Sequence, residues 1–248
     1  MEHQADPASC GAGTAPLHIG IVACSAEGAA LCYRTICTEG PRWFGPRRHP
    51  EVSVHTPPLA AYVDRLERGD LHGVAELMLD SANKLAKVGA DFLICPDNTI
   101  HQAFDFVVER SPLPWLHIAE VVADEAVARR FRRLGITGTR WLVASDVYPR
   151  KLAARGLQWV GPLAAERDEM NRIIMDELVH GVFRPESVAY FQRVIARMKA
   201  EGCDAVVLGC TEIPLVIDDA NSPLPTLDST RLLARAALRR AAQGARTG

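Results

Sequence analysis

Two short segments of the chain share one order of residue types. The first is GADFLICPDNT at 89–99, and the second is GCDAVVLGCTE at 202–212. Each passes from a glycine at a helix end, through an aspartate and a four-residue apolar strand, to a sharp turn with small polar residues. The segments lie 113 positions apart in a chain of 248 residues. The repeat therefore predicts two related α/β lobes, each of which presents one polar turn to a shared cleft.

Short apolar runs alternate with helical patterns along the sequence. Continuous runs of this kind indicate strands buried on both faces, and they lie at 17–23, 91–95, 115–118, 141–144 and 204–208. Helical periodicity follows a capping Asp70, a Pro185 at a first helical position, and a capping Asp228. This alternation predicts an α/β fold with mainly parallel sheets, whose functional groups follow the carboxyl ends of the strands.

The repeat and the composition of the chain ends predict how the sequence divides into a tail and two lobes. Residues 1–15 are rich in Ala, Gly and polar side chains, and we predict a disordered tail there. The first lobe is predicted to contain 16–115 and 222–248, and the second lobe to contain 116–221.

Charge and composition exclude several classes of protein. The 28 Lys and Arg residues nearly balance the 30 Asp and Glu residues, whereas nucleic-acid binders carry a basic excess. No apolar run approaches the roughly 18 residues of a membrane span, and the N-terminus lacks a signal-peptide pattern. We therefore expect a cytoplasmic protein without nucleic-acid or membrane partners. The seven cysteines include no C-x-x-C pair, and zinc and nucleotide-binding motifs are absent.

The two polar turns carry the candidate acid/base residues. In the repeat, Asp97 matches Cys210 and Asn98 matches Thr211. Two acid/base groups on opposite sides of a ligand are what deprotonation and reprotonation of one carbon require. The neighbouring residues at helix N-termini can donate to a carboxylate, and such a terminus would lower the pKa of a thiol. The pattern predicts proton chemistry on a small carboxylic acid.

Three segments resemble the aspartate/glutamate racemase superfamily. They are PDNTIH at 96–101, GCTEIPL at 209–215 and GIVACSAEGAALCYRTI at 20–36, and the resemblance runs from about residue 17 to 238. It implies two pseudo-symmetric Rossmann-like lobes with a shared interlobe active site, no pyridoxal phosphate and no metal. It also implies a homodimer and two opposed cysteines that exchange the α-proton of an amino acid.

The resemblance assigns roles to particular residues. Cys210 falls on the family's second catalytic cysteine. The positions that hold the substrate carboxylate in the family are here Asn98, Thr99 and Thr211. The positions where basic residues contact substrate carboxylates in dicarboxylic amino-acid racemases are here Arg48 and Lys151.

Asp97 replaces the family's first catalytic cysteine, which changes the acid/base balance of the reaction. Reference pKa values of about 3.9 for Asp and about 8.5 for Cys differ by about 4.6 units, or roughly 6 kcal/mol. Burial of the carboxylate and a helix terminus beside the thiol would close much of that gap. Two smaller departures are Ala23-Cys24-Ser25 in place of a glycine-rich opening, and Leu233 in place of a histidine.

Several candidate side chains have two interpretations. Ser25 either binds substrate or caps the first helix, and Asp97 could likewise cap the helix that follows it. Glu212 either holds its loop or contacts the amino group of the substrate. Arg48 lies in segment 40–58, which is either a solvated loop or a mobile lid that offers a guanidinium group to a carboxylate.

The sequence thus predicts a cofactor-independent racemase or epimerase of a small carboxylic acid, such as aspartate or glutamate. The α-proton would be taken and returned by Cys210 and Asp97. Two other enzymes of the same superfamily are alternatives, namely a single-thiol decarboxylase and a cis–trans isomerase of a small diacid. A two-lobed ligand-binding protein without catalytic activity is the alternative from another class.

Overall fold

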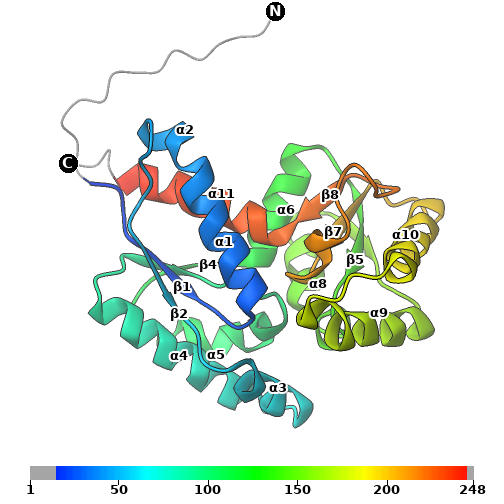
Figure 1. The fold of residues 1–248 in the computed structure, drawn as a ribbon, viewed down its shortest axis with the longest axis horizontal. Helices are drawn as coiled ribbons and strands as arrows, with labels where there is room; N and C mark the ends of the chain where they lie inside the picture. Colours follow the sequence, from blue (N-terminus) through cyan, green and yellow to red (C-terminus); the bar gives the residue numbers. More distant parts are fainter. Residues whose placement is uncertain (1–14, 245–248) are drawn as a thin grey trace, which may run out of the picture.

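The computed structural model describes residues 15–244 and contains two parallel four-stranded sheets, one in each lobe (Figure 1). The first sheet has the order β2-β1-β3-β4, with β1 (Ile19–Val22), β2 (Val52–His55), β3 (Phe92–Ile94) and β4 (Trp115–Leu116). The second has the order β6-β5-β7-β8, with β5 (Arg133–Thr137), β6 (Gln158–Val160), β7 (Ala205–Leu208) and β8 (Thr226–Asp228). The repeat strands β3 and β7 occupy the same place in both sheets, which confirms the predicted two-lobed α/β fold.

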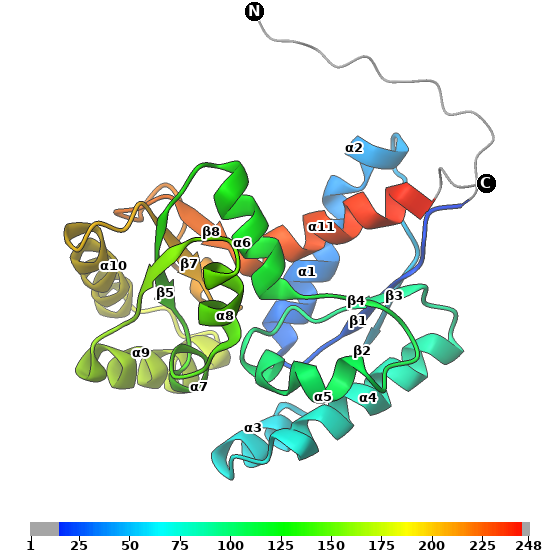
Figure 2. The same cartoon turned by 180° about the vertical axis from the view of Figure 1, so that it is seen from behind.

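Helices cover the faces of both sheets (Figure 2). Those of the first lobe are α1 (Ala26–Glu39), α2 (Pro41–Phe44), α3 (Leu59–Glu67), α4 (Leu71–Lys87) and α5 (Phe104–Val108). Those that follow β4 are α6 (Ile118–Ala128), α7 (Arg140–Val143), α8 (Val147–Ala153), α9 (Ala164–Asp176), α10 (Pro185–Ala200) and α11 (Ser229–Gly244). Three 3-10 turns complete the described elements, namely η1 (Thr99–Ala103), η2 (Leu178–His180) and η3 (Ile213–Leu215).

The aspartates of the repeat have a structural role at the start of each central strand pair. The Oδ2 atom of Asp91 accepts a hydrogen bond from the His18 backbone N–H at 2.6 Å. The carboxylate of Asp204 accepts from the N–H groups of Arg132 and Arg133, at 2.7 and 3.1 Å. Each carboxylate thus fixes the neighbouring strand beside the repeat strand, which explains why the pattern occurs once in each lobe.

One predicted strand is wrong. Residues 140–143 form helix α7, because the Thr139 side chain accepts from the Leu142 N–H at 3.3 Å and so caps a helical turn. The strand of this region is β5, which lies just before that turn. The sequence reasoning overlooked β5 because Arg133, Gly135 and Thr137 interrupt its apolar run. The strands β2, β6 and β8 were also not predicted, because each is short and partly exposed.

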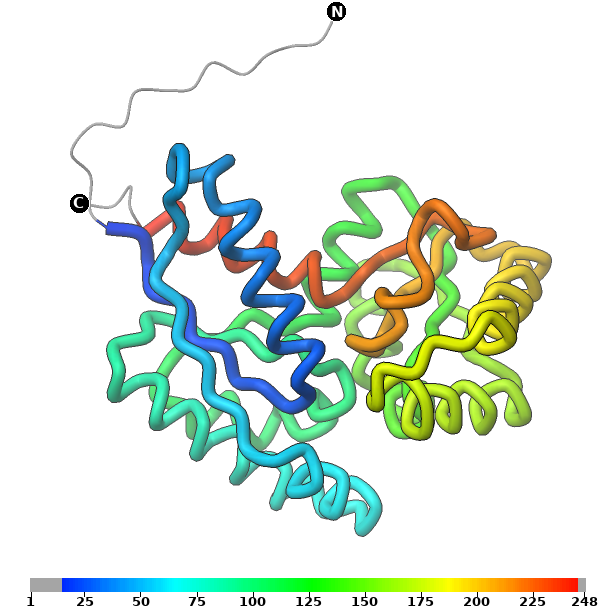
Figure 3. The backbone as a smooth tube through the Cα atoms, viewed as in Figure 1, coloured from blue at the N-terminus to red at the C-terminus, as the bar shows by residue number. Residues whose placement is uncertain are grey.

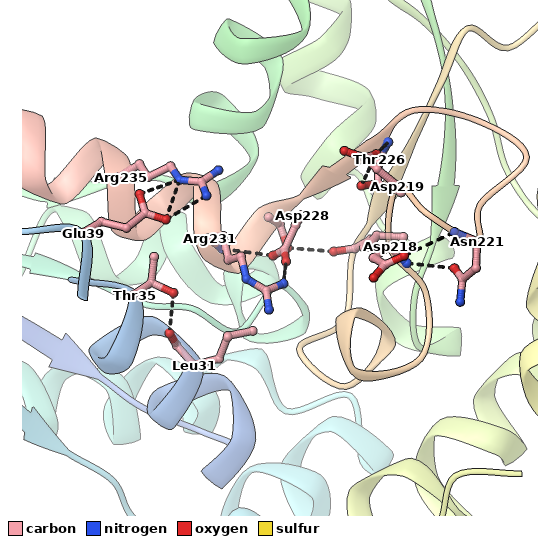
Figure 4. Close-up of polar contacts among 12 residues, drawn as sticks. Leu31, Thr35, Glu39, Asp218, Asp219, Asn221, Thr226, Asp228, Arg231 and Arg235 are labelled. Atoms are coloured by element: carbon pink, nitrogen blue, oxygen red, sulfur yellow. Dashed lines mark hydrogen bonds and ion pairs between the residues drawn. The ribbon is translucent and has the colours of Figure 1, made fainter. Parts of the chain in front are cut away.

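The last helix joins the two lobes. It follows β8 of the second sheet and returns to lie beside α1 of the first lobe (Figures 1 and 3). Figure 4 shows Arg235 of α11 facing Glu39 of α1, with nitrogen–oxygen distances of 2.8–3.1 Å. Leu233 is fully buried in the core that α11 shares with α1 and the first sheet, so the position replaced in the family pattern is a packing position here.

The structure can be compared with the predicted N-terminal tail and with the predicted boundary between the lobes. The predicted tail at 1–15 lies outside the described residues except for Ala15. The second sheet extends to β8, past the expected lobe boundary at 221, while α11 lies against the first lobe. Within residues 15–244, no helix has the length and apolar character needed to cross a membrane.

Candidate active site

A cavity lies where the polar turns of the two lobes meet. Most of the candidate site residues line it, namely Ser25, Asp97, Asn98, Thr99, Cys210, Thr211 and Glu212. The first four belong to the first lobe and the last three to the second. Parallel sheets place functional groups at the carboxyl ends of their strands, and here two such ends face one cavity.

Cys210 follows β7 in a turn that requires a glycine before it. A Cβ atom at Gly209 would lie 2.4 Å from the Thr137 carbonyl oxygen, so no larger residue fits there. The Cys210 thiol donates to the Oε2 atom of Glu212 at 2.9 Å, and Thr211 donates to the same oxygen at 2.6 Å. This arrangement holds a proton on the thiol.

The electrostatics of Cys210 differ from the expectation. Burial, followed by the charge and the hydrogen bond of Glu212, raises the pKa of the Cys210 thiol well above its ordinary value. The predicted lowering by a helix terminus is wrong, because desolvation and an adjacent carboxylate both disfavour the thiolate. The group is therefore a neutral thiol in the resting protein, suited to donate a proton.

Asp97 follows β3 and both caps a turn and lines the cavity. Its Oδ1 atom accepts from the Ile100 backbone N–H at 3.1 Å. Burial raises the pKa of Asp97 from 3.8 to about 6, and the charge of Glu212 adds to the rise. The Ile100 N–H and the Cys24 thiol act in the opposite direction, because both stabilise the carboxylate. At neutral pH the group is thus an ionised base whose proton affinity exceeds that of a free aspartate.

His101 braces the turn that carries Asp97. Its Nδ1 atom lies 2.7 Å from the Asp97 carbonyl oxygen, and its Nε2 atom accepts from the Ile118 N–H at 3.4 Å. Burial lowers the pKa of His101 to about 4, so the ring is neutral and donates through Nδ1. The imidazole therefore links β3 to the first turn of α6 and fixes the position of the carboxylate.

Cys24 and Thr139 line the cavity although sequence reasoning did not select them as site residues. Cys24 lies two residues after β1 and is 5% exposed, and its thiol lowers the pKa of Asp97. Burial and the Asp97 charge raise the pKa of the Cys24 thiol well above its ordinary value. Thr139 follows β5 as Ser25 follows β1, and each caps the next helix. A small polar residue after a strand could have identified Thr139 as a site residue. It was missed because the strand was predicted at 141–144 and not at β5.

Ser25 connects its helix to the opposite lobe. Its Oγ atom accepts from the Gly28 N–H at 3.2 Å, so it caps α1, and it lies 2.9 Å from the Thr211 hydroxyl. A Cβ atom at Gly28 would lie 2.4 Å from the Thr211 Cγ2 atom. The close approach of the two lobes at this point therefore depends on a glycine in α1.

Three further contacts fix the lobes across the cavity. The Thr99 and Thr139 hydroxyls lie 2.9 Å apart. The Asn98 amide donates to Ser229 at 2.9 Å, and its oxygen accepts from the Tyr148 hydroxyl at 2.6 Å. Both ends of the Asn98 side chain are engaged by the second lobe and α11, so this residue sets the relative position of the two polar turns.

Arg48 and Lys151 are not brought to the cavity. Arg48 is exposed in the segment that follows α2. Helix α2 follows the last residue of α1, whereas Ser25 caps the first turn of α1. The Lys151 ammonium group lies 2.6 Å from Glu120 on α6. Among the described residues that line the cavity there is no Lys, Arg or His. Nor does any group of three His, Cys, Asp or Glu side chains within 15–244 have the geometry of a metal site.

Comparison with known proteins agrees with this architecture. The broad specificity amino-acid racemase RacX of Bacillus subtilis (strain 168) is 24% identical over 190 residues, covering 75% of this chain and 80% of RacX. The crystal structure of a candidate Asp/Glu racemase from Yersinia pestis has a TM-score of 0.82 and 27% identity, covering 91% of this chain and 99% of that one. For an aspartate racemase homologue from Pyrococcus horikoshii OT3 the TM-score is 0.77 at 27% identity, with 90% and 98% covered.

The two-lobed parallel fold, matched along nearly the whole described chain, places the protein in the amino-acid racemase superfamily. The sequence model of the Asp/Glu/Hydantoin racemase family matches residues 21–237, and the chain belongs to that family. RacX and a glutamate racemase of Hydrogenobaculum that also matches are named racemases, which are isomerases. The resemblance noted in the sequence is thereby confirmed.

Proposed function

We propose that the protein is a cofactor-independent racemase or epimerase that moves an α-proton between Asp97 and Cys210. The observation that carries this proposal is the meeting of these two groups, one from each lobe, in a single cavity. Their charges interact across it, since the Asp97 carboxylate contributes to the raised pKa of the Cys210 thiol. One group on each side of a carbon is the arrangement that inversion requires.

The resting protonation states define the direction of the first step. Asp97 is ionised above pH about 6, whereas Cys210 carries its proton. The Asp97 carboxylate would take the α-proton of one enantiomer, and the bonding electrons would pass into the substrate carboxylate to form an enediolate. The Cys210 thiol would then protonate the opposite face of the α-carbon. The other enantiomer would react by the reverse transfers, from the state with protonated Asp97 and ionised Cys210.

Neighbouring polar groups support a carboxylate and an amino group in this cavity. The Thr99 hydroxyl lines it and can donate to a substrate oxygen atom while it accepts from Thr139. The Ser25 and Thr211 hydroxyls form a chain of hydrogen bonds that ends on Glu212. The Glu212 carboxylate, 3% exposed, adds a negative charge that attracts an α-ammonium group. The negative charge of Glu212 would balance the positive charge of the α-ammonium group while the Cys210 thiol donates its proton to the α-carbon.

The difference in pKa between Cys210 and Asp97 supports a decarboxylase as a second candidate function. The pKa of Cys210 is raised along with that of Asp97, so the arrangement with a thiolate and a protonated carboxyl group stays unfavourable. A decarboxylase of a substituted malonate needs only the Cys210 thiol as proton donor after carbon dioxide leaves. The same cavity is compatible with that reaction.

Proton NMR in D₂O distinguishes these functions. Purified protein would be incubated with L- and D-amino acids and with substituted malonates, alongside the Cys210→Ser and Asp97→Asn variants. We expect loss of the α-proton signal and formation of the other enantiomer, both dependent on Cys210 and Asp97. Loss of carbon dioxide from a malonate without exchange of any amino acid would replace the racemase by the decarboxylase. Ligand binding without either reaction would favour the binding protein.

We also propose that the protein works as a homodimer. Two large apolar side chains, Tyr33 of α1 and Trp43 of α2, are 45% and 47% exposed on neighbouring helices and support an interface there. Sedimentation velocity tests the assembly state: a monomer at micromolar concentration would exclude it, and a dimer weakened by Trp43→Ser would locate the contact.

A further inference from the structure

The cavity has an apolar lining beside its acid/base groups. Helix α3 contributes Leu59, Val63 and Leu66, and the second lobe contributes Trp141, Met175 and Val179. Sequence reasoning did not select any of these residues, because they lie in α3, in α7 and around the end of α9, far from the repeated turns. Figure 1 shows α3 below the first sheet on the side that faces α9, so the two lobes supply this lining together.

The charges around the cavity are of one sign. Asp97 and Glu212 line it, and the cavity has no cationic side chain among its described lining residues. Nearby cations have other partners: the Lys151 ammonium pairs with Glu120, and the Arg140 guanidinium lies 4.6 Å from the centre of the Trp141 ring. A substrate with a second carboxylate would therefore bring a further negative charge to two existing ones without a counterion.

We propose that the substrate is an α-amino acid with an apolar side chain, and that α3, Trp141 and Met175 form the pocket for that side chain. This inference rests on the proposed function in taking the ligand to be an amino acid. It narrows the sequence expectation, which gave aspartate and glutamate as examples. A zwitterion fits the charge of the cavity, because its ammonium group faces two carboxylates and its α-carboxylate can accept from the Thr99 hydroxyl.

Burial of the substrate side chain against the apolar lining determines how strongly large apolar amino acids should be preferred over small or acidic ones. Transfer of a leucine-sized side chain from water into such a lining favours binding by about tenfold to a hundredfold over a short side chain. An acidic side chain loses its hydration in the same place without gaining a counterion. Leucine, methionine or phenylalanine is therefore expected to bind more tightly than alanine, and alanine at least as tightly as aspartate or glutamate.

Calorimetric titration tests binding separately from turnover. The wild-type protein and Cys210→Ser would be titrated with leucine, methionine, phenylalanine, alanine, aspartate and glutamate, each as L- and D-forms. The inference predicts a Kd at least about tenfold lower for one of the three large apolar amino acids than for alanine, aspartate and glutamate. Tighter binding of an acidic amino acid, equal binding of alanine and all three large apolar amino acids, or no binding of any amino acid would overturn it.

Exchange of the α-proton in D₂O then separates the two proposals. Tight binding of an apolar amino acid with no exchange would support the pocket and contradict the racemase function. Exchange confined to aspartate and glutamate would support the racemase function and overturn the pocket.

A charge placed on the lining gives a second, independent test. Val63 of α3 is half-buried at the cavity, so Val63→Lys should move the ratio of leucine to glutamate affinity at least about tenfold towards glutamate. Val88→Lys is the matched control, because Val88 is 59% exposed at the end of α4 and outside the cavity. Val63→Thr, which keeps the shape of the side chain, serves if the lysine variant does not fold. An unchanged ratio in a folded Val63 variant would overturn the proposal.

Discussion

The Cys210 thiol donates a 2.9 Å hydrogen bond to Glu212, and this contact decides which group is the proton donor at rest. A carboxylate that accepts from a thiol and also adds negative charge beside it stabilises the protonated form twice. Asp97 faces the same cavity, accepts a hydrogen bond from the Ile100 N–H, and has a lower pKa than Cys210. The two sides of the site are therefore chemically unequal, although the lobes that supply them are related.

Replacement of Glu212 by Gln should lower the pKa of the Cys210 thiol. The charge is removed while the shape is kept, so we expect the pKa to fall and the thiolate fraction at a given pH to rise. The rate of Cys210 alkylation by iodoacetamide as a function of pH measures this change, with Cys210→Ser identifying the signal from this residue. An unchanged alkylation profile would show that Glu212 does not hold the thiol proton.

The pH dependence of proton removal by Asp97 should show a limb near pH 6. Asp97 must be ionised to act as a base, so kcat/KM for the enantiomer that it deprotonates should rise as pH passes about 6. Cys24→Ala removes a thiol that lowers the pKa of Asp97, and it should move this limb to higher pH. Cys24→Ser keeps a donor at the same place and is the control. A limb that stays in place in Cys24→Ala would argue against the contact.

Asp97→Asn should be inactive and more stable than the wild type. Loss of a general base reduces kcat by about 10²- to 10⁴-fold. The folded-state pKa of about 6 exceeds the unfolded value of about 3.9, so the ionised carboxylate weakens folding progressively between these two pH values. The variant should gain up to about 3 kcal/mol in free energy of unfolding at pH 7, and little below pH 4. Urea denaturation at both pH values measures the gain, and equal gains would contradict the stated origin.

Gly28→Ala should disturb the contact between the lobes. The added Cβ atom would meet the Thr211 side chain at 2.4 Å, and relief of that overlap requires α1 and the Cys210 turn to separate. We expect a loss of about 1–3 kcal/mol in stability, and a higher KM because Ser25 and Thr211 move apart. Gly161→Ala is the matched control, since a Cβ atom there meets nothing within 4 Å. Equal Tm values for the two variants would show that the lobes adapt freely.

Local patterns were sufficient to predict the repeat, its strands and the two reactive turns. The segments at 89–99 and 202–212 place Asp97 and Cys210 immediately after buried strands, and parallel sheets make such ends the sites of chemistry. The helices after Asp70, Pro185 and Asp228 were likewise predicted, because a capping residue and helical periodicity coincide there. The strand expected at 141–144 was wrong, since four apolar residues in a row do not distinguish a buried strand from a short capped helix.

The alternation of strands and helices, the family resemblance and the pair of turns could be recognised in the sequence, because each rests on patterns within short segments of the chain. Which groups meet at the site depends on the packing of segments that lie far apart in the chain. Cys24, which follows β1, and Asp97, which follows β3, line the same cavity, and so do residues of α3. Arg48 and Lys151 do not line it. The proton affinities of Asp97 and Cys210 depend on burial and on Glu212, and these are properties of the packed lobes and not of any local segment.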